Sequence, residues 1–104
     1  PYTTLFRSYA IIAQDRPDGA EIRRDRRPEH LDYLDANKHL LLAAGAQFAD
    51  DGTTPVGSIL LIDVDDRAAA EQFAANDPFS QAGLFESVKI VPWRKVFFDK
   101  ERVS

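Results

Sequence analysis

Apolar residues gather in short runs along the chain, and most of these runs have the length and flanking residues of β-strands. Residues 9–13 form an apolar run that ends in turn-forming residues, which predicts a buried strand followed by a loop. Two further runs predict strands over residues 40–48 and 57–64, joined as a hairpin. The last predicted strand spans residues 85–96, and Pro92 places it at an edge or a bulge.

Residues 18–38 have the spacing of an amphipathic helix, with a proline in the middle. A proline in a helix interior removes one hydrogen bond and clashes with the preceding turn. We therefore predict a break, with an irregular or helical piece to Arg26 and a new helix whose first residue is Pro28.

A second helix is predicted between two aspartate-containing turns. Asp65 or Asp66 supplies its N-cap, and Asp77 followed by Pro78 ends it, because the residue before a proline is driven out of the helical region. The same Asp77 and Pro78 can start a further short turn of helix, which Gly83 stops.

The predicted order is β-α-β-β-α-β, which indicates an α+β fold with a ferredoxin-like protomer and a four-stranded antiparallel sheet under two helices. Two of its strands, at residues 9–13 and 57–64, are apolar at both alternating sets of positions, although a sheet with one wet face should alternate. We expect a second copy of the chain to cover the other face, giving a homodimer built as an α+β barrel, or a higher assembly of such dimers. The alternative is that these side chains are ordinary exposed apolar residues.

The composition fits one domain. With 104 residues and 44% hydrophobic content, the chain can build one compact core. We expect this domain at residues 9–98, preceded by a leader at 1–8 and followed by a tail at 99–104. Without cysteine the chain has no disulfide or thiolate metal site, and no apolar run is long enough to span a bilayer, so we predict a cytoplasmic protein that binds no membrane.

The net charge of -4 disfavours nucleic acid as a partner, because binding phosphates requires a surplus of lysine and arginine on one face. A basic cluster is present at Arg23, Arg24, Arg26 and Arg27, interleaved with acidic residues. It is interpreted as a solvated face, with an anion site as the alternative. With only two histidines and no metal-ligand spacing, we predict no metal site.

Five segments in a fixed order resemble one known family. They are YAIIAQD at residues 9–15, RPEHL at 27–31, GSILL at 57–61, DPFSQAGLF at 77–85 and IVPW at 90–93. Together they resemble the YciI-like, or YCII-related, proteins over nearly the whole chain.

The resemblance implies a dimeric α+β barrel with a ferredoxin-like protomer. It also implies a histidine and aspartate pair in a cleft beside the sheet, and the matching positions here are His30 and Asp77. One branch of the family is similar to cofactor-free enzymes that eliminate chloride from chlorinated hydroxyquinols, and the fold is shared with muconolactone isomerases.

These residues suggest acid/base chemistry. If Pro28 is the first helical residue, His30 lies in the first turn, where the helix dipole favours a neutral ring that can accept a proton. Asp77 would orient the ring, Arg27 would hold an anionic oxygen of the substrate, and Phe79 would contact the substrate.

The structural alternative is that His30 is a half-buried histidine at the rim of the core and that Asp77 is only an N-cap. Capping and orienting are compatible, because a carboxylate can accept several hydrogen bonds. The predicted function is a cofactor-independent acid/base enzyme, of the lyase (dehydrochlorinase) or isomerase type, acting on a small aromatic or lactone molecule. The competing prediction is a non-catalytic dimeric module that binds a small ligand or a partner protein.

Overall fold

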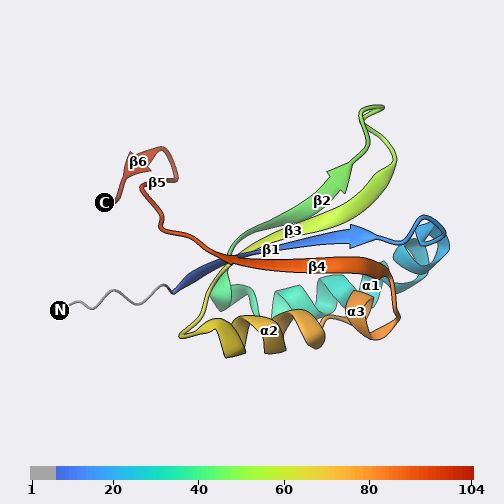
Figure 1. Ribbon diagram of the computed structural model, residues 1–104, viewed down its shortest axis with the longest axis horizontal. Coiled ribbons are helices and arrows are strands. Elements are labelled where there is room, and N and C mark those ends of the chain that lie inside the picture. The colour runs from blue at the N-terminus through green and yellow to red at the C-terminus, as the bar shows by residue number, and fades with distance from the viewer. Residues whose placement is uncertain (1–6) are drawn as a thin grey trace.

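The computed structural model describes residues 7–104 and consists of a four-stranded antiparallel sheet with helices on one of its faces and a separate two-stranded hairpin (Figure 1). Its elements, in chain order, are β1 (Ser8–Asp15), α1 (Ala20–Ala36), the 3-10 turn η1 (Lys38–Leu40), β2 (Leu41–Phe48), β3 (Pro55–Asp63), α2 (Arg67–Ala75), α3 (Pro78–Gln81), β4 (Phe85–Pro92), β5 (Phe97–Phe98) and β6 (Glu101–Arg102). The sheet order is β2-β3-β1-β4. The predicted α+β fold class and its four-stranded antiparallel sheet are therefore confirmed, with β4 as an edge strand that ends at Pro92.

The core lies between the sheet and the helices. Alternate residues of β1 and β3 point toward the helices, because successive side chains of a strand face opposite sides. The buried apolar side chains of this layer come from β1, α1, β3 and α2: Tyr9, Ile11, Leu34, Leu60, Ile62, Ala70, Phe73 and Ala74.

The predicted helix break at Pro28 is wrong. Helix α1 runs without interruption from Ala20 to Ala36, with Pro28 inside it. Proline lacks the amide that would bond to the carbonyl of Arg24, one turn earlier, but both residues are exposed and water can reach that carbonyl. His30 therefore lies well inside α1, too far from the helix N-terminus for the helix dipole there to keep its ring neutral.

The expected caps of the second helical region are present. Asp66 Oδ1 accepts a hydrogen bond from the amide of Ala69 at 2.8 Å, and α2 begins at the next residue. Asp77 caps α3 in the same way, and Gly83 stops that turn with a positive φ of 74°. No helix in residues 7–104 is long and apolar enough to cross a membrane.

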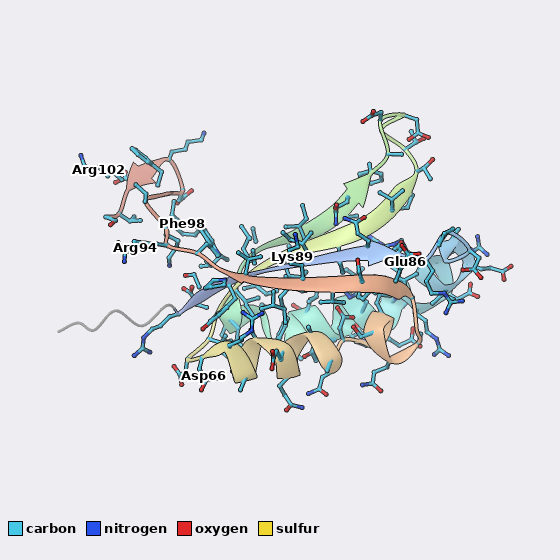
Figure 2. The ribbon with its side chains drawn as sticks, in the orientation of Figure 1. Asp66, Glu86, Lys89, Arg94, Phe98 and Arg102 are labelled. Carbon is cyan, nitrogen blue, oxygen red and sulfur yellow. The ribbon has the colours of Figure 1, made fainter. Side chains whose placement is uncertain are left out.

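The two ends of the chain differ from the sequence pattern. Of the expected leader at residues 1–8, residues 1–6 lie outside the described part of the chain, and Ser8 already belongs to β1. Within residues 97–102, β5 and β6 pair as a hairpin that the sequence did not predict. Figure 2 shows Phe98 and Arg102 on this hairpin, apart from the main sheet.

The sheet face opposite the helices is uncovered in the protomer. The strand register places Ala10, Ile12, Ile59, Leu61 and Val91 on this outer face. Ile59 is 41% exposed, which is high for an isoleucine in a central part of a sheet.

The turn between β2 and β3 is organised by Asp51. Its carboxylate accepts hydrogen bonds from the Thr54 hydroxyl and from the amides of Thr53 and Thr54, which lower the pKa of Asp51 to about 2. Because the folded state favours the charged form, the stability that this turn contributes is present above the ordinary aspartate pKa and is lost as the pH falls toward 2.

We expect Thr54→Val to raise the pKa of Asp51 toward the ordinary value of about 4, because it removes the side-chain hydrogen bond of Thr54, which lowers that pKa most. A carbon-detected NMR titration of the Asp51 carboxyl group in both proteins measures this shift. An unchanged midpoint in the variant would contradict the assigned cause.

Candidate active site

His30 of α1 and Asp77 at the start of α3 meet beneath the sheet. His30 Nδ1 lies 2.8 Å from Asp77 Oδ1, and both side chains are buried, with residue exposures of 7% and 1%. A carboxylate can only accept a hydrogen bond, so the neutral ring carries its proton on Nδ1 and leaves the lone pair on Nε2. The same Asp77 Oδ1 accepts from the amide of Phe79 at 2.9 Å, so this carboxylate caps α3 and orients the histidine together.

An aromatic ring fixes the histidine from another side. Phe79 stacks on His30, with ring centroids 4.0 Å apart and planes inclined by 14°. Phe85 meets the Phe79 ring edge-on at 6.1 Å. The imidazole is therefore held both by a hydrogen bond and by a buried stack, which limits its rotation.

Tyr33 adds to this environment. Its hydroxyl donates to the carbonyl oxygen of Phe73 at 2.8 Å. Burial raises the pKa of Tyr33, and the negative charge of Asp77 raises it further. Tyr33 is therefore a neutral hydrogen-bond donor and adds no second negative charge near the pair.

A buried ion pair lies next to the histidine. Arg23 of α1 donates from Nε to Asp15 Oδ2 at 2.7 Å and from Nη2 to Asp15 Oδ1 at 2.8 Å. Nη2 also donates to Ser58 Oγ at 3.0 Å. The Arg23 guanidinium carbon lies 4.7 Å from the centroid of the Phe79 ring, so this ring contacts both the histidine and the arginine.

These groups border a cavity of about 190 Å³ between α1 and the β2 side of the sheet. Its lining combines charged and polar side chains from α1 and β3 with small or apolar residues: Arg23, Arg27, His30, Leu31, Leu34, Ala44, Gly45, Ala46, Ser58 and Phe79. This volume and lining suit a small molecule with one anionic or polar group.

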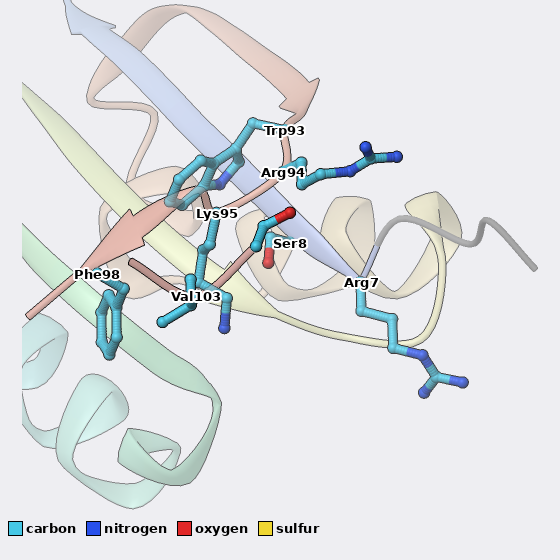
Figure 3. A pocket seen from close by; sticks show the side chains of 8 residues that line it. Arg7, Ser8, Trp93, Arg94, Lys95, Phe98 and Val103 are labelled. Carbon is cyan, nitrogen blue, oxygen red and sulfur yellow. The ribbon is translucent and has the colours of Figure 1, made fainter. Parts of the chain in front are cut away.

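A larger cavity, of about 390 Å³, lies at the other end of the protein (Figure 3). It is bordered by Trp93, Lys95, Phe98 and Val103 and by the start of β1, and contains none of the predicted site residues. It offers no histidine or paired carboxylate for acid/base chemistry. Among residues 7–104, no group of three or more histidine, aspartate or glutamate side chains could hold a metal ion.

All four residues singled out in the sequence lie around the cavity of about 190 Å³. Arg27, His30 and Phe79 border it directly, whereas Asp77 lies behind the His30 ring. The sequence assigned Arg23 to a solvated face and did not predict that it borders the cavity. It also gave no sign of the partners of Arg23, which are Asp15 of β1 and Ser58 of β3.

A usable signal for Arg23 was present in the sequence. Arg23, Arg27, His30 and Leu34 are spaced by four, three and four residues, which places them on one face of a continuous helix. The expected break at Pro28 obscured this alignment.

The sequence matches the profile described as the YCII-related domain over residues 8–94. The chain belongs to the YCII-related family. The expected family is thus confirmed, and the match spans the four-stranded sheet and all the helices.

Several relatives agree with this assignment. Protein YciI of Escherichia coli O6:H1 is 36% identical over 96 residues, which cover 86% of this chain and 98% of the relative. A protein of Haemophilus influenzae is 35% identical with the same coverage. Among solved structures, 5-chloro-2-hydroxyhydroquinone dehydrochlorinase from Burkholderia phenoliruptrix AC1100, in complex with 2,5-dihydroxybenzoquinone, matches with a TM-score of 0.77 and 28% identity, covering 84% of this chain and 93% of that one.

Proposed function

We propose that this YCII-related protein is a cofactor-independent acid/base enzyme, of the lyase (dehydrochlorinase) or isomerase type, with His30 as its general base and Asp77 as the residue that orients it. The observation that carries the proposal is the 2.8 Å contact between His30 Nδ1 and Asp77 Oδ1 at the border of a cavity. This contact leaves Nε2 as the proton acceptor. The likeness to a dehydrochlorinase supports the same reading.

The proposed reaction begins with a proton transfer to His30. His30 Nε2 removes a proton from a C–H or O–H bond of the substrate, and the electron pair of that bond forms a new double bond to carbon or oxygen. In an elimination, an anion such as chloride leaves with the electrons of its bond to carbon. In an isomerisation, the displaced electron pair moves onto a carbonyl oxygen to give an enolate, and His30 then returns the proton to a different carbon as the carbonyl forms again. Asp77 stabilises the imidazolium that is present between the two steps.

Arg27 is proposed to attract the anionic oxygen of the substrate. Its neighbours Arg23, Arg24 and Arg26 each have a carboxylate partner. In residues 7–104, no ion pair or hydrogen bond engages the Arg27 side chain, which borders the cavity. An unpaired guanidinium at a cavity entrance attracts a small anion and can bind it through two hydrogen bonds.

The direct test offers the protein 5-chloro-2-hydroxyhydroquinone and muconolactones, and follows chloride release and absorbance. We expect His30→Gln to lower turnover by about 10²- to 10⁴-fold, because the general base is lost. His39→Gln is the matched control, since His39 is exposed and does not border the cavity. Equal turnover in the wild type and H30Q would refute the proposed base. Binding without turnover of any compound would favour a non-catalytic ligand-binding module.

We also propose that two copies of the chain pair through the outer face of the sheet. All the helices lie on the opposite face, so the apolar side chains of the outer face have no cover within the protomer (Figure 1). Burying such a face against its own copy is a common route to a two-fold dimer.

A charged substitution on the outer face should separate this dimer. We expect Ile59→Glu to shift the sedimentation coefficient from that of a dimer to that of a monomer, because a carboxylate would be buried at the interface. Val88→Glu is the matched control, since Val88 is 42% exposed, against 41% for Ile59, but shares the face of buried Ala13. A monomeric wild type, or equal effects of both variants, would contradict the proposed interface.

A further inference from the structure

Arg23 is a buried cation that borders the candidate active site. It is 7% exposed and projects from the same face of α1 as Arg27 and His30. Asp15 binds it through two parallel hydrogen bonds, and Ser58 accepts a third. This arrangement fixes the plane of the guanidinium, because each of these contacts restricts its rotation.

The guanidinium retains unused donors. The three hydrogen bonds to Asp15 and Ser58 use Nε and Nη2, and none engages Nη1. Within residues 7–104, the only fully buried side-chain nitrogen or oxygen atom without a hydrogen-bond partner is Nε1 of Trp93. Nη1 of Arg23 is therefore not sealed in the core, and the side chain borders the cavity. Two N–H groups remain available to a molecule bound there.

The Phe79 ring contacts both Arg23 and the proposed base, His30. Phe79 stacks on His30 at 4.0 Å and lies 4.7 Å from the guanidinium carbon of Arg23. One buried ring thus contacts both groups. A molecule of one-ring size in the cavity would meet the histidine and the guanidinium together, because both border the same space of about 190 Å³.

The arginines on the cavity lining also favour an anion, because the carboxylate of Asp77 lies behind the His30 ring and does not border the cavity. Asp15 balances the charge of Arg23, whereas no ion pair within the described chain balances that of Arg27. Arg27 can therefore supply net attraction to an anion, and Arg23 can supply hydrogen bonds of fixed direction. A donor fixed by its own partners needs little rearrangement when charge develops on a bound oxygen.

We propose that Arg23 donates hydrogen bonds from Nη1 to the charged oxygen of the substrate, so that the cavity selects small planar molecules carrying an ionised oxygen, such as enolates, phenolates or hydroxyquinone anions. This inference rests on the proposed function, in which His30 removes a proton and the freed electron pair moves onto that oxygen. Arg23 keeps all its protons, and the substrate proton goes to His30. Arg23 is thus a catalytic residue that contacts substrate, with Asp15 and Ser58 as its positioning residues.

The experiment measures the affinity of the full-length protein for 2,5-dihydroxybenzoquinone, which is ionised near neutral pH, and for uncharged 1,4-benzoquinone held under non-reactive conditions. We expect Arg23→Lys to weaken binding of the charged probe about 10- to 100-fold, because lysine keeps the charge but loses the planar pair of donors. The preference for 2,5-dihydroxybenzoquinone over 1,4-benzoquinone, measured as the ratio of their affinities, should fall in the same variant. Arg26→Lys is the matched control, since Arg26 is an exposed arginine of the same helix and does not border this cavity.

A second measurement uses the wild type and does not depend on the fold of a variant. Addition of 2,5-dihydroxybenzoquinone to protein with ¹⁵N-labelled arginine should shift the side-chain signals of Arg23 and leave those of Arg26 in place. Failure of the probe to bind, an unmoved Arg23 signal, or equal affinities of R23K and R26K would each overturn the proposal. His30→Gln separates this test from that of the proposed base, because it should lower turnover by about 10²- to 10⁴-fold and retain binding of the probe.

Discussion

Replacing Asp77 with asparagine should lower turnover by about 10²- to 10⁴-fold while the protein stays folded. Asparagine keeps the side-chain oxygen that accepts from the amide of Phe79, so the cap of α3 survives. It removes the negative charge beside His30, which lies 2.8 Å away. The imidazolium that forms during proton transfer then loses its charge-assisted hydrogen bond.

Two further variants separate capping from catalysis. Asp77→Ala removes both contacts and should also cost stability, by about 1 to 2 kcal/mol for the cap alone. Asp66→Asn is the matched control, because Asp66 is also an N-cap whose carboxylate accepts from a backbone amide, and it has no histidine partner. Steady-state kinetics and urea denaturation of the three proteins give both quantities. If D77N turned over substrate as fast as the wild type, the role of Asp77 would be limited to capping α3.

The second large effect concerns Asp15. We expect Asp15→Ala to lower the free energy of unfolding by about 3 to 5 kcal/mol, because it leaves the Arg23 guanidinium buried without its counter-charge. The side chains of this pair are only 9% and 7% exposed. Urea denaturation at a fixed protein concentration measures the loss, since any association would otherwise change the apparent stability.

An exposed pair provides the comparison. Glu29→Ala removes the partner of Arg26, where the two side chains are 51% and 55% exposed, and should change stability by less than about 1 kcal/mol. Replacing both members of the buried pair, as in D15L/R23M, should recover part of the loss. Similar losses in D15A and E29A would show that burial of Arg23 does not govern the effect.

The sequence predicted the order of the strands and helices of the main sheet because the apolar runs and the helix caps agreed with the tertiary fold. The apolar runs of β1 and β3 lie at the centre of the sheet, and Asp66 and Gly83 terminate helices as expected. His30 and Asp77 are far apart in sequence, so local patterns could not pair them. The family resemblance predicted the pair, and the structure has the two side chains in contact.

Two parts of the structure escaped the sequence reasoning for physical reasons. The proline predicted a helix break, but Arg24 and Pro28 are exposed, so water can satisfy the carbonyl that the proline leaves unpaired and the helix continues. With a break at Pro28, Arg23 would not share a helix face with Arg27 and His30, so its place at the site was not predicted. The β5–β6 hairpin turns at Asp99 and Lys100, both with positive φ. Lysine is rare in that conformation, so the usual asparagine or glycine signal of a tight hairpin is absent.

Pro28 lies between the proposed anion donor and the proposed base on α1. Arg23 precedes it and His30 follows it on the same helix. Because α1 is continuous, the helical repeat places both residues on one face of the helix. Pro28 fixes its own φ and leaves the carbonyl of Arg24 without its helical hydrogen bond, so the turn between the two residues gains one constraint and loses another. Pro28→Ala restores that hydrogen bond and frees the backbone angle, so it changes the backbone between the proposed base and the proposed anion donor without removing a side chain of the site.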